Sequence, residues 1–186
     1  MQWYEKILND IPKKEKSSFD FSFLKWKEDR SGKGAYNLIS GEKIIGSLVF
    51  QDKKRKTAVG CINDYDFFIG KKGLISQRIT ISGHSSNNEL TLSVNNLNGE
   101  GELSSFDQDK INWKRIDELN NQWMFSDENN EPLIIFSPRS SFYLSGYNID
   151  IRNEKIDGQL TQTLLLLGLF MLVSLSMDIS LDSIFL

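Results

Sequence analysis

Hydrophobic and polar residues alternate along most of the chain, from residue 19 to about residue 151. At the start of this region Phe19, Phe21 and Phe23 are separated by Asp20 and Ser22. Side chains in a strand point alternately to opposite faces, so this segment predicts a strand with three aromatic side chains on one face.

Short segments of the same kind follow along the chain at intervals of roughly 8–12 residues, with turn-forming residues between them. They predict a hairpin that turns at Ser40-Gly41 within residues 36–50, and strands at residues 57–62, 65–69, 74–81, 89–94, 111–116, 122–126, 132–136 and 141–144. No alternation of strands with helices is visible, which disfavours a doubly wound nucleotide-binding fold. The pattern therefore predicts a mainly β protein, an antiparallel sandwich or barrel.

The C-terminal region carries a different pattern, because residues 164–177 contain no charged residue. Leu, Met, Phe and Gly dominate this segment, and we expect a helix over residues 160–177. A helix that is apolar on all sides must be buried, either in lipid or inside protein. The fourteen uncharged residues would span about 21 Å, which is less than the roughly 30 Å hydrocarbon core of a membrane. No Lys or Arg follows Lys155, and no Trp or Tyr follows Tyr147.

We therefore expect a closed antiparallel β-barrel around a buried hydrophobic C-terminal helix. The alternative is a tail-anchored membrane protein whose β domain faces the cytosol. The N-terminal residues 1–16 predict a short amphipathic helix, with apolar residues such as Trp3, Ile7 and Ile11 on one side. The expected organisation is thus a helix and connector over residues 1–18, followed by a single barrel domain over residues 19–186.

Composition narrows the functional classes. The net charge of −3 and the pI near 5.3 provide no general basic field, so we expect no nucleic-acid partner. The single cysteine, Cys61, cannot form an intrachain disulfide and agrees with a reducing compartment. The charged N-terminus lacks the apolar run of a signal peptide. These features predict a cytoplasmic protein, and attachment to the periphery of a membrane is compatible with them.

Two strand-rich segments, residues 36–50 and 122–136, and the apolar residues 164–177 with the following Asp178 together resemble the tubby C-terminal-like superfamily. This superfamily includes the LURP-one-related proteins and the phospholipid scramblases. The resemblance implies a closed β-barrel wrapped around a central hydrophobic helix. Tubby proteins bind phosphoinositides through basic residues on the barrel, although none of those residues is matched to a position of this chain.

The densest group of basic residues is the run Lys53, Lys54, Arg55 and Lys56, which we take as the candidate contact with an anionic phospholipid headgroup. The alternative interpretation of this cluster is a solvated hairpin turn. We expect a non-enzymatic binding or scaffold domain whose partner is an anionic phospholipid or a protein.

No catalytic, cofactor or metal site is expected, because His84 is the only histidine and has no second imidazole or thiol to complete a zinc site. A barrel enzyme or small-ligand carrier in which Asp64, Asp66 and His84 meet is the remaining alternative.

Overall fold

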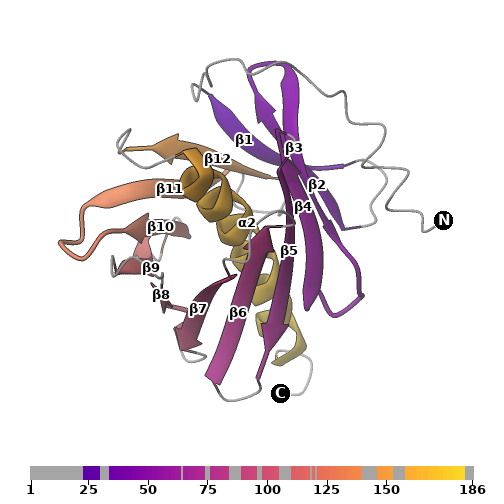
Figure 1. Ribbon diagram of the computed structural model, residues 1–186. Helices are drawn as coiled ribbons and strands as arrows, with labels where there is room; N and C mark the ends of the chain where they lie inside the picture. The colour runs from indigo at the N-terminus through magenta and orange to yellow at the C-terminus, as the bar shows by residue number, and fades with distance from the viewer. Residues whose placement is uncertain are drawn as a thin grey trace.

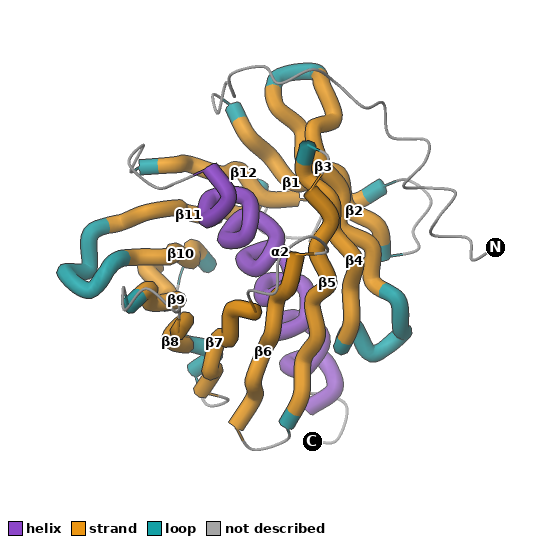
Figure 2. Tube along the Cα trace, in the orientation of Figure 1, coloured by secondary structure: helices purple, strands orange, loops and turns teal. Residues whose placement is uncertain are grey.

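Twelve antiparallel strands form a closed barrel, and one helix passes through the ring of strands (Figures 1 and 2). The computed structural model describes residues 23–29, 34–63, 65–73, 76–83, 89–95, 98–104, 110–117, 119, 121–139, 146–152 and 158–182. The strands are β1 (Leu24–Glu28), β2 (Ala35–Ser40), β3 (Lys43–Phe50), β4 (Thr57–Ile62), β5 (Tyr65–Lys72), β6 (Ser76–Gly83), β7 (Glu89–Asn95), β8 (Gly101–Ser104), β9 (Ile111–Asp117), β10 (Gln122–Ser126), β11 (Pro132–Pro138) and β12 (Gly146–Ile151).

Each strand pairs with the strands before and after it in the sequence, and the pairing of β1 with β12 closes the barrel. The closing register places Leu24 opposite Ile149 and Trp26 opposite Tyr147, and all four side chains are buried. Closure gives each of the twelve described strands a partner on both sides, which removes a template for aggregation. The predicted antiparallel barrel is therefore confirmed.

The sequence missed three strands, β1, β8 and β12, and misplaced one aromatic side chain. It ended its first strand at residue 23, before β1 begins, and it predicted no strand in the polar residues 95–105, where β8 lies, or at β12. The predicted strand at residues 141–144 lies outside the described residues. The prediction that Phe23 belongs to an aromatic strand face is wrong. Phe23 lies in a turn before β1 with a φ of 59°, and its side chain is 85% exposed.

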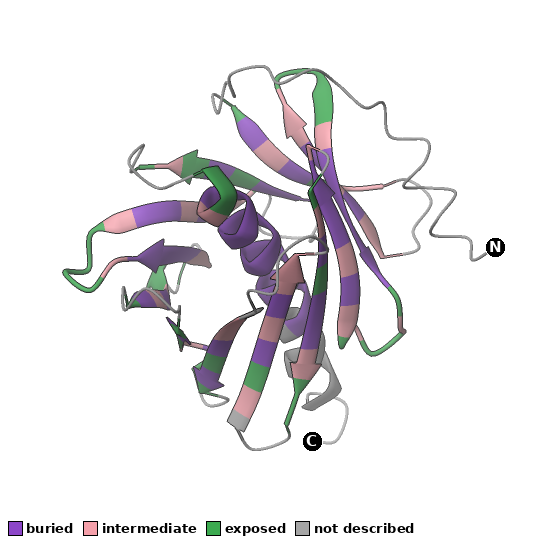
Figure 3. Cartoon of the chain, viewed as in Figure 1, coloured by how far each residue is buried: buried purple, intermediate pink, exposed green. Residues whose placement is uncertain are grey.

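The C-terminal helix α2 (Gly158–Asp182) is confirmed and is longer at both ends than predicted. Residues 161–174 are all buried, as the colouring along α2 in Figure 3 shows. Inside the barrel, the indole Nε1 of Trp26 donates a hydrogen bond to the backbone oxygen of Leu165 at 3.3 Å. This contact ties β1 directly to the helix backbone.

Two glycines allow α2 and the barrel wall to approach closely. A Cβ atom at Gly168 of α2 would lie 2.3 Å from Cζ of Phe136, and one at Gly60 of β4 would lie 2.6 Å from Cδ2 of Leu166. The ring of Phe136 therefore packs on bare helix backbone, and the side chain of Leu166 packs on bare strand backbone. Such interlocking contacts fix both the rotation and the height of the helix in the barrel.

The predicted N-terminal helix and connector, residues 1–18, lie outside the described residues. Within the described ranges, no helix combines the length and the apolar character that crossing a membrane requires.

Candidate functional site

The four predicted cations lie in the connection between β3 and β4, at the end of the barrel where β3 and β5 end. Lys53, Lys54 and Lys56 are exposed, whereas Arg55 is half-buried. The structure therefore separates three outward lysines from one arginine that packs against the protein.

Asp52 holds this connection in shape. Its carboxylate accepts hydrogen bonds from the backbone N–H of Lys56 at 3.0 Å, from the backbone N–H of Thr57 at 2.7 Å and from the Thr57 hydroxyl at 2.7 Å. Desolvation raises the pKa of Asp52, but these hydrogen bonds and one from the Lys54 backbone together lower the pKa below its usual value. The ionised carboxylate thus fixes the backbone from which the lysines project.

Arg55 links the connection to the core. Its backbone has a φ of 51°, and its guanidinium lies 5.6 Å from the centre of the Phe50 ring, a cation–π distance. Burial raises the pKa of Tyr36, and Arg55 opposes this rise.

Phe50 stacks in turn on Phe170 of α2, with ring centres 5.4 Å apart and planes inclined by 24°. A continuous series of contacts therefore runs from Arg55 through Phe50 to the central helix. The expectation that Arg55 contacts a headgroup together with the three lysines stays a prediction.

The barrel register brings two further cations beside the predicted ones. The backbone N–H of Lys71 donates to the backbone oxygen of Lys56 at 2.8 Å, which places the end of β5 beside the connection. The next residue, Lys72, lies directly opposite Arg78 of β6, and both side chains are exposed. We call Lys53, Lys54, Lys56, Lys72 and Arg78 the basic rim.

None of the basic-rim side chains forms an ion pair with another described residue. Like charges directly opposite each other on neighbouring strands destabilise a sheet, so the pairing of Lys72 with Arg78 has a cost in the unbound protein. Sequence reasoning missed Lys72 because it interpreted residues 70–73 only as a turn, and it missed Arg78 because the pairing partner of the predicted strand 74–81 was unknown. The register of β5 against β6 is the signal that would have found them.

The other candidate residues are only partly described by the structure. Asp64 and His84 lie outside the described residues, and Asp66 is half-buried on β5. Cys61 is buried on β4. Among the described residues, no group of three or more His, Cys, Asp and Glu side chains is arranged to hold a metal ion.

Fold and surface together define a closed twelve-stranded antiparallel barrel with a C-terminal helix and a basic rim at one end. No protein-family model, curated protein or solved structure matches the chain.

Proposed function

We propose that the protein is a non-enzymatic, cytoplasmic binding domain that attaches reversibly to anionic phospholipid surfaces through the basic rim. The observation that carries this proposal is the group of five exposed cations without a carboxylate partner among the described residues. The chain as a whole has a net charge of −3, so only an oriented surface of this kind would favour an anionic membrane.

The magnitude of the interaction supports a reversible attachment. Each Lys or Arg near an anionic membrane surface contributes about 1 kcal/mol. Five cations would therefore supply roughly 5 kcal/mol, which corresponds to binding in the submillimolar range. This binding is strong enough to recruit the protein to a charged surface and weak enough to be released by salt.

The proposal includes a tubby-like architecture in which α2 fills the barrel and serves as its core. The burial of residues 161–174 supports this role over that of a tail anchor, because a helix enclosed by the barrel cannot also lie in lipid. On this view Arg55, Phe50 and Phe170 hold the headgroup-binding connection on the central helix.

The test is cosedimentation of the full chain with vesicles of phosphatidylcholine alone, with phosphatidylserine added, and with a phosphoinositide added. We expect binding only to the anionic vesicles. The double charge reversal Lys53→Glu/Lys54→Glu should weaken binding at least about 30-fold, because two attractions of about 1 kcal/mol are lost and two repulsions are added. A preference for the phosphoinositide over phosphatidylserine at equal charge would distinguish headgroup recognition from general electrostatic attraction.

The matched control is Lys25→Glu/Lys43→Glu, which changes the net charge equally but alters β1 and the start of β3. This variant should bind almost as the parent protein does. Equal weakening by both double variants would show that net charge alone drives binding. Absence of binding to every anionic vesicle would refute the proposal and leave a protein as the partner to seek.

A further inference from the structure

Three outward-pointing side chains of β3 and β4 are buried. Gly60 of β4 faces the interior, since a Cβ atom there would lie 2.6 Å from Cδ2 of Leu166. The next residue, Cys61, therefore points outward, yet it is only 6% exposed. Cys61 lies opposite Ser47 of β3, and Val49 is on the same face two residues later. Ser47 and Val49 are 8% and 9% exposed, so an area of the outer barrel wall is covered.

The described strands and helix do not provide this cover. Val49 has only Ala35 of β2 and Val59 of β4 beside it in the sheet, and both side chains are small. Within the described part of the chain, all twelve strands belong to the ring and α2 lies inside it. None of these elements lies over the outer face of β3 and β4. The cover must therefore come from another part of the chain or from a second molecule.

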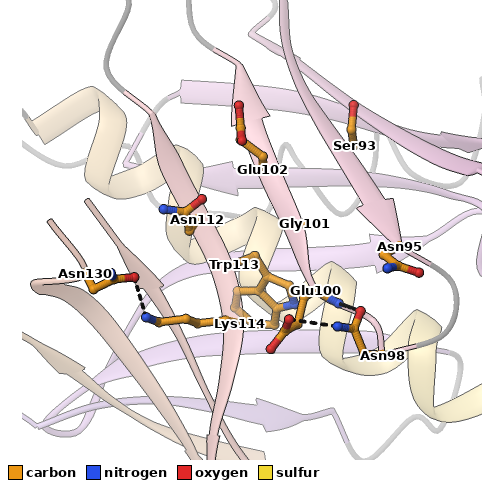
Figure 4. Close-up of a pocket in the computed structure, with 10 residues that line it drawn as sticks. All are labelled: Ser93, Asn95, Asn98, Glu100, Gly101, Glu102, Asn112, Trp113, Lys114 and Asn130. Carbon is orange, nitrogen blue, oxygen red and sulfur yellow. Dashed lines mark hydrogen bonds between the residues drawn. The ribbon is translucent and has the colours of Figure 1, made fainter. Parts of the chain in front are cut away.

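Ser93 of β7 is the matched comparison. It points outward as Ser47 does, because it alternates with Val94, a residue of the core. Ser93 lies between the larger side chains of Arg78 and Glu102 and lines the pocket drawn in Figure 4, and it is exposed. Large neighbours in the sheet thus do not bury an outward serine, so the burial of Ser47 requires a cover.

The covered area is about two strands wide. Phe68 of β5, which lies opposite Val59, is 46% exposed, and Ile44 near the start of β3 is 59% exposed. Neighbouring strands are about 4.8 Å apart, and an α-helix with its side chains is about 10–12 Å across. One short helix laid along β3 and β4 would therefore cover the three buried positions and leave Phe68 open.

Residues 1–16 have the character that such a helix requires. The sequence predicts an amphipathic helix there, with Trp3, Ile7 and Ile11 among the apolar residues on one side. An amphipathic helix is stable when its apolar side packs against another surface. The outer face of β3 and β4 offers the apolar side chains of Val49 and its neighbours for this contact.

The chain is long enough for this contact. Residues 1–22 are the longest segment outside the described ranges, and they lead directly to Phe23 before β1. Residues 17–22 can extend to about 20 Å. The three strand spacings from β1 to β4 amount to only about 14 Å. The covered area is therefore within reach of residues 1–16.

We propose that residues 1–16 form a helix that docks on the outer face of β3 and β4, with its apolar side chains on Val49, Val59 and Cys61. The docked helix accounts for the burial of the outward side chains, and it gives the apolar side of the helix a partner surface. The proposal is independent of the basic rim. It makes the N-terminal segment part of the barrel domain.

Cys61 is the only cysteine, so its reaction with Ellman's reagent measures the cover directly. A buried thiol is inert until the structure over it opens. In the full chain, Trp3→Asp/Ile7→Asp places two charges on the apolar side of the helix and should speed the reaction at least about tenfold. The matched control is Gln2→Asp/Asn9→Asp, which adds the same charge on the opposite side of a helix with about 3.6 residues per turn. The control should react within about twofold of the parent rate, and equal rates in the two variants would overturn the proposal.

The parent protein allows a measurement that needs no variant. In a nuclear Overhauser spectrum, the aromatic protons of Trp3 should show cross-peaks to the methyl groups of Val49 or Val59, and their absence would refute docking on this face. The reaction rate of Cys61 should also be independent of protein concentration, because cover and barrel belong to one chain. A rate that falls as the protein concentration rises would identify a second copy as the cover and overturn the assignment to residues 1–16.

Discussion

Substitution of Gly168 by alanine tests whether α2 and the barrel wall interlock. The added Cβ would lie 2.3, 2.7 and 2.9 Å from Cζ, Cε2 and Cε1 of Phe136. The ring cannot easily move away, because Phe136 packs edge-on against Trp113 with ring centres 5.7 Å apart and against Phe125 at 6.1 Å. Either the helix or this aromatic cluster must therefore shift.

The expected sign is opposite to that of an ordinary Gly→Ala change in a helix. Helix propensity alone would stabilise the alanine variant by about 0.5–1 kcal/mol. Overpacking a filled core costs about 1–3 kcal/mol. We therefore expect Gly168→Ala to reduce the free energy of unfolding by roughly 1–2 kcal/mol, which lowers Tm by about 2–4 °C for each kcal/mol in a protein of this size.

The assay is equilibrium unfolding in urea of Gly168→Ala, Phe136→Leu and the double variant. The smaller leucine removes the ring atoms that meet the new methyl group, so the double variant should be more stable than the sum of the single changes predicts. Gly158→Ala is the matched control, because a Cβ there has no atom within 4 Å, and it should not destabilise the protein. An unchanged or increased stability of Gly168→Ala would refute the interlocking contact.

Three further predictions concern the helix, the turn and the core. Deletion of residues 158–186 should abolish folding, as monitored by circular dichroism and NMR dispersion. Burial of the nine apolar side chains between Leu164 and Val173 contributes roughly 14–27 kcal/mol to the stability of the fold. This exceeds the net stability of a typical domain, which is about 5–15 kcal/mol. A truncated protein that still folds would instead favour the tail anchor. Asp52 has a lowered pKa in the folded state, so its contribution to stability should be present above about pH 4 and lost as the pH falls through the folded pKa. In urea unfolding, the stability of Asp52→Asn should therefore fall less than that of the parent protein over this acid range. Burial raises the pKa of Tyr147 to about 12, so the native state should lose stability as the pH rises from about 10 toward that value, and Tyr147→Phe should show a smaller alkaline loss in the same assay.

The sequence predicts the architecture well because the two patterns that define it are local. Alternation along segments such as residues 57–62 and 65–69 reflects one buried and one outer face, and the structure has β4 and β5 there. The uncharged residues 164–177 similarly lie within α2. β8 escaped prediction because only Leu103 of its four residues is a buried apolar side chain, and Gly101 gives no alternation signal.

The candidate site was predictable only in part, because its members are distant in sequence and meet through strand register. Four consecutive cations at residues 53–56 are visible in the sequence, but their division into three outward lysines and one inward arginine depends on the turn that Asp52 and Thr57 impose. Lys72 and Arg78 become neighbours of that turn only once β5 is aligned with both β4 and β6.

The same reasoning explains why the net charge of −3 hides a basic surface. Composition averages over every face, whereas the proposed membrane contact involves only one end of the barrel. The cations of the β3–β4 connection also depend on the core, since Arg55 packs on Phe50 and Phe50 packs on Phe170 of α2. A substitution of Phe170 that leaves the protein folded should therefore alter vesicle binding although no surface charge changes. If the β3–β4 connection were only a solvated turn, the same substitution would have no effect on vesicle binding.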